Sequence, residues 1–131
     1  IRAERPEAAS FIHRRIVDLG PERSDDPDHQ ELLDFVFVTA SFLLGLRAAE
    51  SSDHAVALRH FQVIADGRIF DSSNTGRVFL VRCDARLNAA QLLERMRRVP
   101  EAIRYYTDLT HSMCAGTERH FAEERLEHLA P

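Results

Sequence analysis

The chain has 131 residues and a mass of 15.0 kDa, which fits a single domain over residues 1–131 that is large enough to bury a hydrophobic core. Hydrophobic residues make up 44% and charged residues 29% of the sequence, and these shares exclude an intrinsically disordered chain. The net charge of −4 disfavours a protein that binds nucleic acid non-specifically, because such a protein needs surplus cations to neutralise phosphate groups.

The N-terminal part predicts two helices joined by an acidic loop. Apolar residues at helical spacing predict a helix over residues 6–19, which Gly20 ends. Asp28 and Glu31 match a capping box for a second helix, and Asp26 followed by Pro27 offers an alternative start. Residues 32–49 are apolar on nearly every side of a helical wheel, so we expect this second helix to be buried on most sides.

The middle of the chain predicts a helix followed by a β-hairpin. Residues 51–53 form a polar break with the composition of an N-cap, and residues 53–65 place their apolar side chains on one broad arc. We expect Gly67 to end this helix. Residues 68–70 and 77–83 have the composition of strands and flank the turn formers at residues 72–76.

The C-terminal part predicts further helices. Residues 87–98 form a clear amphipathic pattern that stops before Pro100. Residues 101–129 continue as helix, with an interruption near Gly116. The expected fold class is therefore α+β, mostly helical with one β-hairpin and similar to a winged helix.

Residues 46–82 carry motifs of a known family. The expected helix ends in Arg59-His60-Phe61-Gln62-Val63-Ile64, and the phrase Gly76-Arg77-Val78-Phe79-Leu80 lies beyond the turn. These motifs resemble the recognition helix and the wing of ArsR-type winged-helix repressors. The resemblance implies a homodimeric DNA-binding transcription regulator whose paired recognition helices occupy an operator.

The resemblance also implies roles for individual residues. His54 and Arg59 would face the major groove, and Gln62 would lie nearer the phosphates. Arg77 would reach DNA from the wing. In this interpretation the terminal helices, which are rich in leucine and tyrosine, form the dimer interface.

Two other interpretations use the same residues. In the first, residues 77–83, the helix at 87–98 and a strand at 101–107 form part of a ferredoxin-like α+β sheet. The chain is then a non-catalytic small-molecule-binding or protein-interaction module. In the second, a small enzyme uses His54 or His60 as general base, although no set of catalytic partners accompanies them in the sequence. Pairing of residues 101–109 as a strand beside residues 77–83 would exclude the winged helix.

Potential metal ligands gather near the C-terminus. His111 lies three residues before Cys114, and His120 lies three residues before Glu123, so each pair would share one face of a helix. Imidazole, thiolate and carboxylate groups are all suitable zinc ligands. The sequence leaves zinc as a possible cofactor at these four residues and indicates no other.

Cysteine usage and hydropathy predict the compartment. The two cysteines, Cys83 and Cys114, are too few for a disulfide framework, which favours a reducing environment. Cys83 follows an apolar run, so we expect it to be a small core residue. The longest uncharged run, residues 35–46, is too short to span a bilayer, and the first ten residues lack an apolar signal core. We therefore expect a cytoplasmic protein without a membrane partner.

Overall fold

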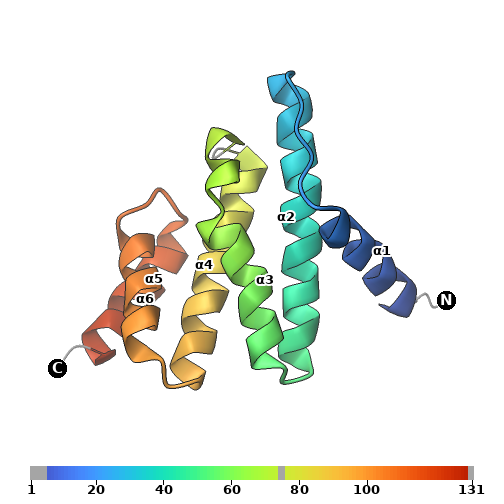
Figure 1. Cartoon of the computed structure of the whole chain (residues 1–131). Coiled ribbons are helices and arrows are strands. Elements are labelled where there is room, and N and C mark those ends of the chain that lie inside the picture. The colour runs from blue at the N-terminus through green and yellow to red at the C-terminus, as the bar shows by residue number, and fades with distance from the viewer. Residues whose placement is uncertain (1–5, 74–75, 130–131) are drawn as a thin grey trace.

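The computed structural model describes residues 6–73 and 76–129, and this part of the chain is helical without a β-strand (Figure 1). The elements in chain order are α1 (Pro6–Leu19), α2 (Pro27–Glu50), α3 (His54–Asp66), the short 3₁₀ helix η1 (Arg68–Ser73), α4 (Gly76–Arg95), α5 (Val99–Thr110) and α6 (Gly116–Leu129).

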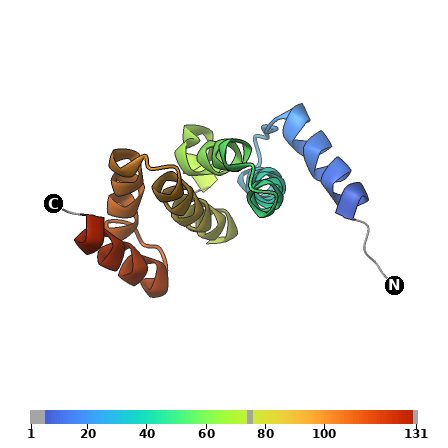
Figure 2. The ribbon, with the colours of Figure 1, turned by 90° about the horizontal axis from the view of Figure 1, so that it is seen from below.

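The helices form a row in which each packs mainly against its neighbours in the sequence. α2 to α6 run alternately up and down, and α1 and α6 lie at opposite ends of the row (Figures 1 and 2). α1 packs against α2, α2 against α3 and α4, and α5 against both α4 and α6. The row therefore has two end helices, each of which leaves one side uncovered by the rest of the described chain.

Local sequence signals set several helix ends. Gly20 takes a φ of +82°, which favours glycine and ends α1 where the sequence predicts. Asp26 caps α2 by accepting a hydrogen bond from the Asp28 amide at 3.0 Å, and Pro27 follows in the first turn. Of the two predicted starts of this helix, the one at Asp26 is therefore confirmed, and the capping box of Asp28 and Glu31 is not formed at its start. Asp53 caps α3, as the polar break at residues 51–53 predicts.

The core lies where α2, α3, α4 and α5 meet. α2 and α3 approach closely because Gly45 has no side chain; a Cβ atom there would lie 2.8 Å from the ring of Phe61. Tyr105 and Tyr106 are fully buried and place their hydroxyl groups against carboxylates of neighbouring helices. Each hydroxyl donates a hydrogen bond of 2.5 Å, Tyr105 to Asp66 and Tyr106 to Glu94. Burial and the Asp66 carboxylate raise the pKa of Tyr105 to about 12.

The predicted hairpin is wrong, because residues 77–83 belong to α4 and residues 68–70 to η1. The run RVFLVRC resembles a strand when seven residues are considered alone. Over the whole of α4 the buried side chains recur at helical spacing instead: Val78, Arg82, Ala85, Ala89 and Leu92. Arg82 interrupts the apolar pattern of this stripe, so the helical period is difficult to recognise in the sequence. Of the expected turn, Asn74 and Thr75 lie outside the described residues.

The α+β fold class is wrong for the same reason, in both of its forms. A winged helix needs a two-stranded wing, and the residues expected to form it are helical in the part of the chain that the structure describes. The ferredoxin-like alternative needs a strand at residues 101–107, but these residues lie inside α5. The interruption expected near Gly116 is confirmed, since α6 begins there.

One helix in the described ranges, α2, has the length and composition of a membrane span. Its most apolar window has a mean hydropathy of 1.7, and 39% of that window is buried in the structure. The core helix of a soluble protein meets the same criteria, so they are weak evidence for a span. In the structure α2 packs against α1, α3 and α4.

Acidification is expected to weaken the attachment of α1 to the row. Burial lowers the pKa of His13 on α1 and of His60 on α3, and Arg47 beside His13 and Arg59 and Arg14 beside His60 lower it further. The folded chain thus takes up these protons less readily than the unfolded chain. The contribution of these two histidines to the free energy of unfolding should therefore fall as the pH drops through about 6.5.

Thermal unfolding followed by far-ultraviolet circular dichroism checks this expectation. Between about pH 7.5 and about pH 5.5 we expect the two histidines to lower the Tm by a few degrees, while protonation of Glu118, whose pKa is raised, acts in the opposite direction. The double variant His13→Gln, His60→Gln should lack the histidine contribution, so its Tm should fall less or rise more over this range than that of the unaltered chain, and the exposed His111→Gln serves as the control. If the Tm of the double variant changes with pH in the same way as that of the unaltered chain, His13 and His60 do not cause the expected pH dependence.

Candidate functional site

The outer side of α1 exposes large apolar side chains. Phe11, Ile12 and Leu19 are 64%, 57% and 68% exposed. Ile12, Ile16 and Leu19 follow one another at helical spacing, so they form one stripe along the helix. Contiguous apolar surface of this kind on a folded chain usually marks an interaction site.

Two hollows extend this apolar stripe toward α2, α3 and η1. The first has a volume of about 140 Å³ and is lined by residues that include Ile16, Leu19, Val36 and Phe37. The second has a volume of about 340 Å³. Phe37 lines both hollows and stacks on Phe70 of η1, with 5.8 Å between the ring centroids. The hollows are therefore built on the core rather than on loose surface side chains.

The second hollow also carries exposed apolar side chains at its edge. Val63 of α3 and Ile69 of η1 line it and are 48% and 40% exposed. Val36, which lines the first hollow, is 42% exposed. We call the set Phe11, Ile12, Leu19, Val36, Val63 and Ile69 the apolar surface.

Polar contacts hold the linker between α1 and α2 in place beside the hollows. The side chain of Gln30 accepts a hydrogen bond from the Ser24 amide at 2.6 Å and donates one to the Glu22 carbonyl at 3.0 Å. It also donates to the buried carboxylate of Asp34 at 2.8 Å. These bonds fix the linker to α2, so the apolar surface has a preformed shape.

The opposite end of the row is polar. In α6 the large apolar side chains Phe121, Leu126 and Leu129 are partly buried against the core. The exposed positions of this helix are polar or charged: Thr117, Arg119, His120, Glu123, Glu124, Glu127 and His128. Met113, in the segment between α5 and α6, is 90% exposed, so the difference between the two ends lies in the helices themselves: α1 exposes three large apolar side chains, and the described residues of α6 expose none.

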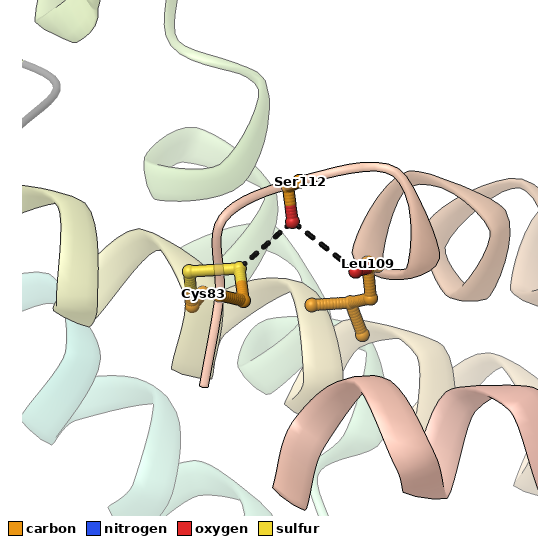
Figure 3. Close-up of a disulfide and its surroundings, with 4 residues drawn as sticks. Cys83, Leu109 and Ser112 are labelled. Atoms are coloured by element: carbon orange, nitrogen blue, oxygen red, sulfur yellow. Dashed lines mark hydrogen bonds between the residues drawn. A yellow bond between two sulfur atoms is a disulfide. The ribbon is translucent and has the colours of Figure 1, made fainter. Parts of the chain in front are cut away.

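A second candidate site surrounds a disulfide between α4 and the segment before α6. Cys83 and Cys114 are joined, with 5.8 Å between their Cα atoms, and both are buried (Figure 3). Cys83 is therefore a buried residue, as expected, but it is paired. Ser112 lies beside the disulfide, with its hydroxyl oxygen 3.0 Å from the sulfur of Cys114. The expectation of a cytoplasmic protein was based on unpaired cysteines, and it stays a prediction.

A carboxyl pair lies next to this disulfide. The two sulfur atoms and a carboxylate oxygen of Glu118, in the first turn of α6, lie within 4.8 Å of one another. Burial, a hydrogen bond with Asp84 and the charge of Asp84 together raise the pKa of Glu118 to about 8. Near neutral pH the Glu118 carboxyl is therefore mostly protonated.

The residues expected to contact DNA lie on two helices, α3 and α4, rather than on a helix and a wing. His54 begins α3, and Arg59 lies one turn later. Gln62 lines the second hollow instead of facing outward alone. Arg77 lies on α4, where its guanidinium group stacks over the ring of Phe35 at 4.4 Å from the centroid. Without a wing, the role that the resemblance implies for Arg77 has no counterpart in this fold.

The expected metal ligands are placed apart from one another. His111 follows α5 and is exposed, and His120 lies 3.4 Å from Glu124 on the outer side of α6. Glu123 is exposed as well. Of the four, only Cys114 belongs to the donor cluster found among the described residues. Sequence reasoning missed Glu118, because Cys114 precedes α6 and the contact between the two depends on how the chain enters that helix.

Comparison of the chain with protein-family models, with curated proteins and with solved structures gave no match.

Proposed function

We propose that this chain is a protein-interaction module that forms a homodimer through the apolar surface on α1. The observation that carries the proposal is the difference between the two ends of the helix row. Terminal helices of stacked helical arrays keep a polar outer face in water, because nothing covers them. α6 has such a face, whereas α1 exposes more than half of Phe11, Ile12 and Leu19.

A second copy of the chain suits this surface better than an unrelated partner. In a two-fold dimer the same patch on both copies is covered at once, so one contact removes both apolar ends from water. In an antiparallel pair of α1 helices, Ile12 of one copy lies opposite Leu19 of the other. Arg15 and Asp18 share the outer side of α1, so the same pairing places each Arg15 between the Arg15 and the Asp18 of the other copy.

The hollows provide room for the partner's side chains. Leu19 and Val36 form the edge of the first hollow, next to the α1 stripe. Large apolar side chains that enter preformed hollows supply most of the binding free energy in protein interfaces. The dimer would leave the two polar α6 ends exposed, which closes the assembly at two copies.

The test is the oligomeric state in solution, measured by sedimentation velocity over a range of concentrations. We expect a dimer, and we expect Leu19→Glu to raise its dissociation constant by at least about tenfold. Leu80→Glu is the matched control, because Leu80 is 55% exposed on α4, outside the apolar surface. A monomer at every concentration, or equal weakening by both variants, would overturn the proposal.

Winged-helix DNA binding is not part of this proposal, since the wing residues are helical. Zinc stays a proposal for this chain, but at a donor set that differs from the one expected. It concerns the cluster around Cys83, Cys114 and Glu118 rather than the apolar surface.

A further inference from the structure

We propose that the Cys83–Cys114 cluster is a redox-gated zinc site, in which reduction of the disulfide frees two thiolates that bind Zn²⁺ together with the Glu118 carboxylate. The three donor atoms lie within 4.8 Å of one another and come from separate parts of the fold. Cys83 lies in α4, Cys114 precedes α6, and Glu118 lies in the first turn of α6.

The backbone spacing suits both states of the cluster. The Cα atoms of Cys83 and Cys114 are 5.8 Å apart. Tetrahedral zinc holds each sulfur at about 2.3 Å, which separates two thiolates by roughly 3.8 Å. Cα atoms this close allow two sulfurs at that separation, because rotation of each cysteine side chain moves its sulfur while the backbone stays in place.

The chemical class of the donors favours zinc. Two thiolates and one carboxylate match the ligand preference of a borderline-soft divalent ion and exceed its charge by one. Asp84 is hydrogen-bonded to Glu118 and so borders the three donors. Burial of Cys83 and Cys114 excludes water from the sulfur side of the site, which strengthens the electrostatic attraction.

The gating step is a balanced thiol–disulfide exchange. A dithiol reductant attacks one sulfur of the disulfide through its thiolate and forms a mixed disulfide. Its second thiolate then releases the protein thiol, so the reductant becomes a disulfide and the chain gains two electrons and two protons. Zinc binding displaces the two thiol protons into solvent. Since the same sulfurs serve both states, disulfide and zinc exclude each other.

The test is cobalt binding to the chain, with a phosphine reductant present or absent. Co²⁺ reports thiolate ligands through charge-transfer absorption, and Zn²⁺ added afterwards should displace it. We expect one ion per reduced chain and none per oxidised chain. The double variant Cys83→Ser, Cys114→Ser should lose the signal, and Glu118→Gln should weaken zinc affinity by at least about tenfold.

Further variants separate this donor set from the one expected from the sequence. Glu123→Gln, His111→Gln and His120→Gln should bind as the unaltered chain does, because these side chains lie outside the cluster. Glu118→Gln keeps the disulfide and thus folds in its oxidised form before reduction. If reduction lowers the helical circular dichroism, zinc should restore it. No cobalt–thiolate band in the reduced chain, equal affinity of Glu118→Gln, or loss in a histidine variant would each overturn the proposal.

Discussion

Arg82→Met is expected to lower the free energy of unfolding by about 3–5 kcal/mol. Arg82 is 3% exposed and lies in the middle of the buried stripe of α4. Its Nε donates to the carbonyl of Ile64 at 3.1 Å, and its Nη2 donates to those of Ala65 and Gly67 at 3.2 Å each. One side chain thus satisfies the carbonyl groups that the end of α3 leaves without helical partners.

The same guanidinium group also holds η1. Its Nη1 lies 3.1 Å from a carboxylate oxygen of Asp71, which balances the buried charge. Methionine fills a similar volume but donates no hydrogen bond, so the α3 carbonyls would stay buried and unpaired. A positive charge near the C-terminus of α3 also offsets the helix dipole, and this contribution would be lost as well.

Urea unfolding followed by circular dichroism measures the expected loss. Arg95→Met is the matched control, because Arg95 is exposed on the same helix, and it should change stability by less than about 0.5 kcal/mol. Arg82→Lys should lie between the two, since one ammonium group cannot serve three carbonyls in the geometry of a guanidinium. A loss below about 1 kcal/mol for Arg82→Met would refute the capping role.

The helices whose signals are local could be predicted from the sequence. Residues 6–19 form α1 with the expected bounds, because Gly20 and the apolar spacing act within a few residues. Asp26, Asp53 and Gly116 mark helix starts for the same reason. The error at residues 77–83 arose where a buried arginine, which the core accepts only because the end of α3 needs donors, interrupts the apolar period.

The two candidate sites depend on contacts that are distant in the sequence. The pairing of Cys83 with Cys114 requires α5 to return the chain to α4, which neither cysteine signals locally. The exposure of Phe11 and Ile12 depends on the position of α1 at the end of the row, which the helical spacing of residues 6–19 does not indicate. Of the three donors in the cluster, only Cys114 was among the metal ligands expected from the sequence.

Removal of the disulfide is expected to cost about 3–4 kcal/mol in buffer without metal. Cys83 and Cys114 are 31 residues apart, so their bond closes a long loop and restricts the unfolded chain. The bond also ties the start of α6 to α4. Among the described residues of α6 only Ala122 is buried, so this helix gains less from packing than its neighbours do. The loss of stability should therefore be concentrated at the end of the row that α6 forms.

The double variant Cys83→Ser, Cys114→Ser should unfold at lower urea concentration than the unaltered chain, and reduction of the unaltered chain should produce the same shift. The reductant should have no further effect on the double variant, which separates the bond from other effects of the reagent. Hydrogen exchange adds the spatial readout, because local opening raises exchange only where protection is lost. We expect removal of the disulfide to raise the exchange rate more in α6 than in α2. Equal acceleration in both helices would mean that the bond stabilises the whole row rather than its end.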